Sequence, residues 1–216
     1  MSSTQFLDKL QTAEKICGLY LFHNFLGVDE RGSVFKVFNG ANFPWDLKPK
    51  LYGIELEQHA YYFDRKPKKF KGNEALSTLE MLCQRLEKDF DINIVGVFCN
   101  RLQDQTHNLP WHKDSYGTHI FVLSLGSQRT IEFRESKTGV VESLRPSEGD
   151  MYLLPLGLNK THQHRVCPGK DGDGTRISLV FFFRAPKYAK DFKISFREKV
   201  TGFIETLYLI IRELIS

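Results

Sequence analysis

The pattern of apolar and polar positions divides the chain into a helical first part and a strand-rich second part. Residues 4–16 (TQFLDKLQTAEKI) place apolar side chains at helical intervals. Residues 73–90 (NEALSTLEMLCQRLEKDF) do so more fully, and Asn73 can cap that helix. Short apolar runs bounded by glycine at 18–28 and 32–40 predict strands.

After residue 90 the chain consists of short strand-like runs. Turn sequences such as SKTG, RPSEGD and GKDGDG separate them. The predicted strands cover 93–99, 118–125, 129–134, 140–144, 150–156, 163–167 and 175–184. Many short strands separated by such turn sequences predict a β-sandwich, barrel or jelly roll, preceded by helices and loops.

The last segment has a different pattern. Residues 200–216 (VTGFIETLYLIIRELIS) predict an amphipathic C-terminal helix. The helix is too short to span a membrane, and it carries Glu205, Arg212 and Glu213. We therefore expect it to pack on the sheet or to mediate self-association.

Composition and charge narrow the class of protein. The 216 residues are 41% hydrophobic, which suffices for the core of one sizeable domain. The net charge of +4 permits a nucleic-acid partner, and five basic residues fall within 64–72 (DRKPKKFKG). Four cysteines without metal-ligand spacing, no signal-peptide core and no membrane-length apolar run indicate a soluble intracellular protein of the cytoplasm or nucleus.

His112 and Asp114 form a candidate metal-binding pair. Residues two apart in an extended strand point to the same face, so both side chains can reach one ion. His162 or His164, which follow a later strand, can supply a third ligand. Two histidines and one carboxylate leave coordination positions open, as in Fe(II) oxygenases.

Arg176 begins a strongly apolar strand and therefore needs an anion. A bidentate guanidinium–carboxylate pair is the natural solution. A dicarboxylic co-substrate that chelates iron at one end would meet this need with its other end.

The order of these residues resembles the AlkB-type iron- and 2-oxoglutarate-dependent dioxygenases. Asn100 precedes His112 by twelve residues, His164 lies in a distant stretch HRVCP (164–168), and Arg176 opens the final core strand. Further matches are SLG at 124–126, GD at 149–150 and the lid-like KLYG at 50–53. The resemblance covers roughly residues 45–186.

The resemblance implies a fold and a set of ligands. The fold would be α+β, with a double-stranded β-helix (jelly-roll) core at about 92–186, flanking helices and a nucleotide-recognition lid at about 47–72. Residues 1–199 would form one dioxygenase domain. Fe(II) would be held by the catalytic triad of His112, Asp114 and His164. The co-substrate 2-oxoglutarate would be held by Arg176 and Asn100, and O2 would be the oxidant.

Some positions depart from the family pattern. Leu102 stands where the family has a tyrosine that contacts 2-oxoglutarate, and Phe182 stands where it has a second arginine. Arg184, two residues further along, is the candidate replacement. Tyr116 occupies a place that is often acidic in the family.

The implied substrate is a nucleic-acid base that leaves its stack to reach the iron. Such a base needs aromatic walls and a basic rim. The candidate substrate-binding residues are Tyr61, Tyr62, Phe63, Trp111, Tyr116, Lys66, Lys68 and Lys69. We expect oxidative demethylation of alkylated DNA or RNA bases. The alternatives are hydroxylation of a protein side chain or small molecule, and a non-catalytic nucleic-acid binding module.

Overall fold

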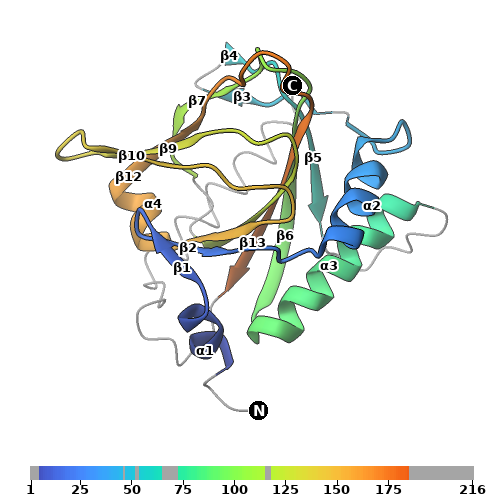
Figure 1. The fold of residues 1–216 in the computed structure, drawn as a ribbon, viewed down its shortest axis with the longest axis horizontal. Helices are drawn as coiled ribbons and strands as arrows, with labels where there is room; N and C mark the ends of the chain where they lie inside the picture. Colours follow the sequence, from blue (N-terminus) through green and yellow to red (C-terminus); the bar gives the residue numbers. More distant parts are fainter. Residues whose placement is uncertain (1–4, 46, 52–53, 65–72, 115–117, 185–216) are drawn as a thin grey trace.

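Two antiparallel sheets form the body of the protein. A computed structural model of the chain describes residues 5–45, 47–51, 54–64, 73–114 and 118–184 (Figure 1). The seven strands of the large sheet lie in the order β1 (Glu14–Ile16), β2 (Leu19–Phe22), β11 (Met151–Leu154), β8 (His119–Gly126), β13 (Arg176–Arg184), β6 (Asn93–Leu102) and β5 (His59–Asp64).

The small sheet lies against one face of the large sheet. Its four strands lie in the order β10 (Val141–Leu144), β9 (Ile131–Glu135), β12 (His162–Val166) and β7 (Leu109–His112). Side chains from both sheets form one buried cluster, which we call the interior of the sandwich. It includes Phe133 and Val166 from the small sheet, and Val122 and Phe182 from the large sheet. The expected jelly-roll-like β-sandwich with flanking helices is therefore confirmed.

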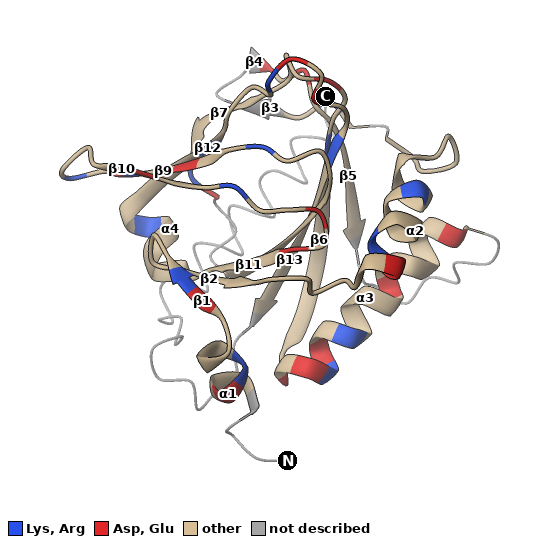
Figure 2. Ribbon diagram, in the orientation of Figure 1, with Lys and Arg blue, Asp and Glu red and all other residues tan. Residues whose placement is uncertain are grey.

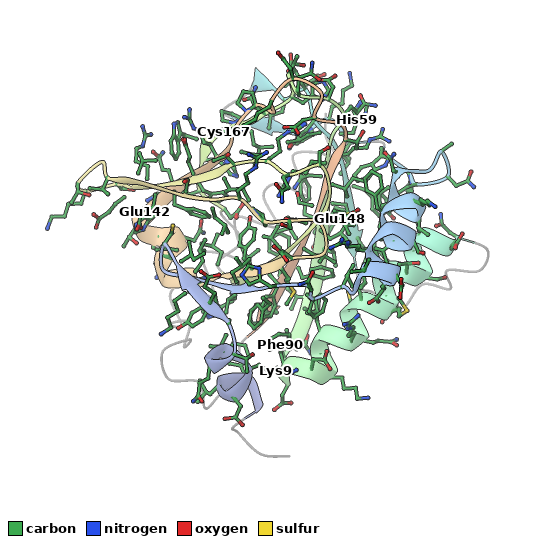
Figure 3. The ribbon with its side chains drawn as sticks, in the orientation of Figure 1. Lys9, His59, Phe90, Glu142, Glu148 and Cys167 are labelled. Carbon is green, nitrogen blue, oxygen red and sulfur yellow. The ribbon has the colours of Figure 1, made fainter. Side chains whose placement is uncertain are left out.

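Helices cover the other face of the large sheet. They are α1 (Gln5–Gln11), α2 (Val28–Asn39) and α3 (Glu74–Phe90), and Figure 1 places α2 and α3 together on one side of the sheet. The second core cluster joins them to the sheet. In it, Phe90, which is labelled in Figure 3, packs on Phe6 of α1 with ring centroids 6.4 Å apart. The strand β8 is buried on both faces, because one faces the helices and the other the interior. Among the described residues, no helix is long and apolar enough to cross a membrane.

The helix α3 follows the predicted bounds. Asn73 caps it, since its side-chain oxygen accepts a hydrogen bond from the backbone N–H of Leu76 at 3.1 Å. The apolar stripe of Leu79, Leu82 and Leu86 is buried, while charged residues of both signs mark the helix in Figure 2. Helix propensity and tertiary packing agree here, which is why the sequence was sufficient.

Two predictions about the first forty residues were wrong. Residues 32–40, predicted as a strand, lie mainly in α2, because Val34 and Phe38 are four residues apart and are buried together on one helical face. The helix predicted over 4–16 ends at Gln11, and residues 14–16 form β1 instead. A short helix α4 (Leu156–Thr161) between β11 and β12 was not predicted.

A second small element extends the fold beside β5. The strands β3 (Lys50–Leu51) and β4 (Ile54–Glu55) form a hairpin within the segment predicted as the lid. Leu47 pairs with Ala60 of β5 through backbone hydrogen bonds of 3.0 and 2.9 Å. This part of the predicted lid is therefore attached to the edge of the large sheet. The remainder, like the predicted helix at 200–216, lies outside the described residues.

Arg129 is a buried cation that connects several loops through an ion pair and hydrogen bonds. Its side chain is fully buried and forms an ion pair with Asp173 at 3.1 Å. It also donates hydrogen bonds to the backbone oxygens of Gln128, Asp104 and Gly174 at 3.3, 3.0 and 2.9 Å. These bonds compensate the cost of removing the guanidinium from water.

Candidate metal centre

His112 and His164 face one another across neighbouring strands. They are paired directly in the register of β7 and β12, and their ring centroids are 4.2 Å apart. Asp114 follows β7, with its carboxylate oxygens 3.9 Å from Nε2 of His112 and 3.5 Å from Nε2 of His164. One ligand atom from each residue lies within 4.8 Å of the others, so small rotations bring all of them to one ion.

The hydrogen bond of His112 and the lowered pKa of His164 suit metal binding. Nδ1 of His112 lies 2.8 Å from the carbonyl oxygen of Pro110. A carbonyl can only accept a hydrogen bond, so Nδ1 carries a hydrogen and Nε2 is the nitrogen that would bind a metal. Burial lowers the pKa of His164 to about 4, and His112 lowers it further while Asp114 opposes the shift. His164 is therefore neutral at pH 7.

A β-bulge in β7 determines to which face of the small sheet the side chain of His112 points. His164 pairs with His112 and Val166 pairs with Leu109, so β7 contains one residue more than β12 between these pairs. Pro110 is tolerated there because β7 is the edge strand of the small sheet. The bulge allows both Leu109 and His112 to face the interior although they are three residues apart.

Trp111 lies on the opposite face of the small sheet. Its ring packs beneath the guanidinium groups of Arg134 and Arg165, at 4.4 and 4.7 Å from the ring centroid. Arg165 follows His164 in β12, and adjacent strand residues point to opposite faces. The predicted role of Trp111 as a wall beside the metal would require its side chain on the face of His112, and the structure places it on the other.

A polar patch lies on the interior face of the large sheet. Ser178 of β13 pairs in register with Asn100 of β6 and with Ser124 of β8, so the three form a row across neighbouring strands. Arg176 lies one inward-facing position away on β13, is 3% exposed, and its Nη2 is 3.5 Å from the hydroxyl of Ser124. No carboxylate lies within ion-pair distance of Arg176 among the described residues.

Tyr152 is a further polar side chain of the interior. Its side chain is 5% exposed in the interior, and burial raises the pKa of its phenol. Arg176 lowers this pKa and Asp114 raises it, so the phenol interacts electrostatically with both groups. Burial also lowers the pKa of Arg176, an effect that Tyr152 opposes. The interior thus contains both the buried cation Arg176 and the candidate metal ligands.

These features fit Fe(II) and 2-oxoglutarate. Two imidazoles and one carboxylate suit Fe(II) and leave positions for a chelating co-substrate and O2. A dicarboxylate reaching from the metal would supply the anion that buried Arg176 lacks. Oδ1 of Asn100 is buried without a hydrogen-bond partner, and rotation of this amide would present its NH2 group to a carboxylate.

The aromatic residues predicted to bind substrate fall on two faces of β5. Tyr61 and Phe63 pack in the helix-side core, where Tyr61 contacts Phe43 with ring centroids 5.2 Å apart. Tyr62 lies against the interior cluster, and its hydroxyl is next to Gly96. Strand alternation therefore leaves Tyr62 as the member of this trio on the side of the metal centre.

Several predicted site residues lie outside the described part of the chain. They are Lys66, Lys68, Lys69 and Tyr116. Arg184 ends β13, but its side chain is not described; its backbone lies eight residues from Arg176 along the strand. Leu102 and Phe182, which replace polar family residues, are buried in the interior cluster and make this part of the interior apolar.

Sequence reasoning missed two polar residues of the site. Tyr152 follows the GD pair at 149–150 by two residues, so strand alternation from Asp150 could have found it. Asn159 is 5% exposed and contacts the backbone of Asp114 from α4. Its only sequence signal was a polar side chain within the apolar stretch LPLGLN.

Comparisons with known proteins agree with this geometry. Residues 94–185 match the sequence model of the 2OG-Fe(II) oxygenase superfamily. The fold is similar to the solved structure of OsALKBH1, with a TM-score of 0.52 and 15% identity over 76% of this chain and 97% of that chain. An RNA replication protein of Grapevine virus A (isolate Is 151) is 32% identical over 56 residues.

That viral match covers 26% of this chain and 3% of the relative, so the chain spans a small part of the length of that protein. The family match contains all three candidate metal ligands together with Asn100 and Arg176. Residues 94–185 are therefore similar to the 2OG-Fe(II) oxygenase superfamily, whose cofactors are Fe(II), 2-oxoglutarate and O2, and the chain has an AlkB-like fold.

Proposed function

We propose that the chain oxidatively demethylates alkylated nucleic-acid bases. The observation that carries the proposal is the pairing of the triad with buried Arg176 inside one sandwich. Support for a nucleic-acid substrate comes from the AlkB-type resemblance and the similarity to OsALKBH1 in fold. The partial viral relative is an RNA replication protein by name, which favours single-stranded RNA among the substrates to be tested first.

Each residue has a defined task in this proposal. His112, Asp114 and His164 would hold Fe(II), and Arg176 would bind the distal carboxylate of 2-oxoglutarate. Iron and 2-oxoglutarate, when bound, supply the oxidation of a carbon–hydrogen bond by O2. Apolar Leu102 and Phe182 would help to exclude water from the co-substrate. The products would be the demethylated base and formaldehyde from the substrate, and succinate and CO2 from 2-oxoglutarate.

A cationic and aromatic group lies beside the described part of the predicted lid. Nη2 of Arg101 donates to Nδ1 of His59 at 2.9 Å, and its guanidinium lies 5.0 Å from the ring centroid of Trp45. Burial lowers the pKa of His59, as do Arg101, Lys48 and His107, so the histidine stays neutral beside the arginine. Figure 3 labels His59 and so shows where this group lies in the molecule.

Arg101 has the chemistry of a phosphate ligand. Among the described residues it has no carboxylate partner, and its Nε is buried without a hydrogen-bond partner. A phosphate oxygen would satisfy that donor. Nucleic-acid binding through this group should weaken as salt increases, because phosphate contacts release counterions.

The test is a turnover assay with Fe(II), 2-oxoglutarate and O2. Single-stranded RNA and DNA oligonucleotides carrying N-methylated bases would be compared with unmethylated strands and with peptide pools. Release of succinate together with formaldehyde, dependent on base methylation, is the expected result. Turnover stimulated by peptides but by no nucleic acid would replace this proposal with protein hydroxylation.

Two variants separate chemistry from binding. His112→Ala should abolish succinate release with every substrate, because it removes a metal ligand. Arg101→Gln should weaken oligonucleotide binding about tenfold and flatten its salt dependence, as expected for the loss of one phosphate contact. No succinate from any pool with the wild-type protein, together with retained oligonucleotide binding, would indicate a non-catalytic binding module.

A further inference from the structure

The short helix α4 is fastened to the candidate ligand Asp114. Asn159 accepts a hydrogen bond from the backbone N–H of Asp114 at 3.1 Å through Oδ1. Its Nδ2 donates to the backbone oxygen of Asp114 at 2.6 Å. One side-chain amide thus satisfies both backbone groups of Asp114, as a neighbouring strand would do.

This contact occurs where strand pairing has ended. The strand β7 stops at His112, so Asp114 lies beyond the ladder that fixes the backbone of the first histidine. The side chain of Asp114 is 18% exposed. Its backbone makes no strand pairing, because β7 has already ended. A flexible backbone at this point would allow the carboxylate to move away from both imidazoles.

The same helix is connected to the third ligand. It is followed directly by β12, which begins at His162 and carries His164 two residues later. Its N-terminal end is held by buried His119, whose Nδ1 accepts from the N–H of Leu156 at 3.1 Å. Lys113 donates to the backbone oxygen of Lys160 at 2.6 Å. Helix α4 therefore bridges the segment of Asp114 and the strand of His164.

We infer that Asn159 is a positioning residue that holds the carboxylate of Asp114 against His112 and His164, and so sets the metal affinity of the triad. The inference rests on the proposed metal centre, but it requires no particular substrate. Asparagine is suited to this position because it offers one donor and one acceptor with a short side chain. Aspartate has the same shape but no donor, so its oxygen would face the backbone oxygen of Asp114 without a hydrogen.

Burial argues against a purely superficial role for Asn159. It is 5% exposed, and its amide makes two hydrogen bonds to the same residue. Helix α4 retains its links through His119 and Lys113 when the amide is removed. Loss of the amide should therefore affect the position of Asp114 more than the fold.

The experiment measures the binding of Co(II) alone to the full chain. Calorimetric titration gives the affinity, and the visible absorption of bound Co(II) reports its coordination. Asn159→Ala and Asn159→Asp should raise the Kd for Co(II) about 10- to 100-fold, as changes in residues that orient metal ligands do. Both should also alter the Co(II) spectrum. The metal-free proteins should unfold within a few degrees of the wild type.

Thr161→Ala is the matched control. Thr161 donates to the backbone oxygens of Gly157 and Leu158 at 3.2 Å, so the variant removes hydrogen bonds within α4 without touching Asp114. It should leave the Kd and the spectrum unchanged. An equal loss of affinity in Thr161→Ala would mean that α4 as a whole, and not the amide, is responsible.

The outcomes are distinguishable from those of the proposed function. Unchanged Co(II) affinity and spectrum in the Asn159 variants would overturn the inference, whatever the enzyme oxidises. If Asn159→Ala does not fold, Asn159→Asp, which preserves the volume, decides the question. A wild-type protein that binds Co(II) with the expected sensitivity to Asn159 but oxidises no nucleic acid would refute the demethylase proposal alone. Failure of the wild type to bind Co(II) would overturn both.

Discussion

Arg176 and Arg129 are both buried, but in the described part of the chain only Arg129 has a carboxylate partner. Arg129 is fully buried and lies 3.1 Å from Asp173, whereas Arg176 is 3% exposed and has the hydroxyl of Ser124 at 3.5 Å as its hydrogen-bond partner. A buried charge without a counter-ion destabilises a fold. From this difference we propose that Arg129 serves stability and that Arg176 serves the binding of an anion.

We predict opposite effects on stability when each arginine is replaced by methionine. Arg176→Met should raise the free energy of unfolding of the co-substrate-free protein by about 1 kcal/mol, since it removes an uncompensated charge. Arg129→Met should lower the free energy of unfolding by about 3–5 kcal/mol, because it leaves Asp173 and backbone oxygens without their partner. Urea denaturation of the metal-free proteins measures both values.

Arg176→Met should at the same time impair the use of 2-oxoglutarate. We expect KM for 2-oxoglutarate to rise about 100-fold, which corresponds to about 2.7 kcal/mol of lost binding. A variant that is less stable than the wild type, with KM unchanged, would show that Arg176 is structural.

Metal binding should stabilise the wild-type protein but not a ligand variant. At a Co(II) concentration about 100 times the Kd, linkage predicts about 2.7 kcal/mol of additional stability. Asp114→Ala should lose this increment, because it removes the carboxylate between the two imidazoles. Thermal unfolding with and without Co(II) provides the measurement, and an equal increment in the variant would exclude Asp114 as a ligand.

Gly126 should tolerate no side chain. It has φ +73, it pairs in register with Arg176, and a Cβ at this position would overlap the carbonyl oxygen of Thr175. Gly126→Ala should therefore lower the free energy of unfolding by about 3 kcal/mol, the sum of backbone strain and steric displacement. Gly172→Ala is the control, because Gly172 has φ +86 but nothing within 4 Å of a Cβ. It should cost about 1 kcal/mol from strain alone.

His23 should make stability depend on pH. Nε2 of His23 lies 2.7 Å from Glu14 and Nδ1 lies 3.5 Å from Asp150, and the hydrogen bond to Glu14 is the main cause of the raised pKa of His23. A raised folded-state pKa gives a stabilisation that is complete below pH 6.5 and is lost as pH rises through the folded-state pKa.

His23→Gln should accordingly destabilise the protein more at pH 5.5 than at pH 8.5. The difference should be about 0.5 kcal/mol or less, since the ring is half exposed and solvent screens the pair. Urea denaturation at both pH values is the measurement. His162→Gln is the control, because no carboxylate lies within ion-pair distance of His162 among the described residues. A pH-independent effect of His23→Gln would contradict the assignment.

The sequence was most informative where local pattern and packing agreed. Most strands after residue 92 were predicted near their observed positions, because each apolar run ends at a turn sequence and contributes side chains to one of the two core clusters. The helix α3 was predicted for the same reason. The strand β7, which carries His112, was not predicted. Residues 32–40 were misread because a nine-residue run with Val34 and Phe38 fits both a strand and a helix until its partner surface is known.

The site was predictable in composition but not in geometry. Spacing alone left His162 and His164 open, and the pairing of His164 with His112 depends on strand register, which no local signal contains. Trp111 was placed next to the ligand by sequence adjacency, although strand alternation sends its ring to the other face. Asn159 was missed because the six-residue helix α4 is too short to show a helical period.

The bulge at Pro110 and Trp111 affects how this segment should be compared with relatives. In a regular strand, Leu109 and His112 could not both face inward, since positions three apart lie on opposite faces. A homologue with one residue fewer here could keep both side chains inward on a straight strand. Alignments should therefore allow a gap at this point, and a search that demands fixed spacing upstream of the H-x-D pair would overlook such homologues.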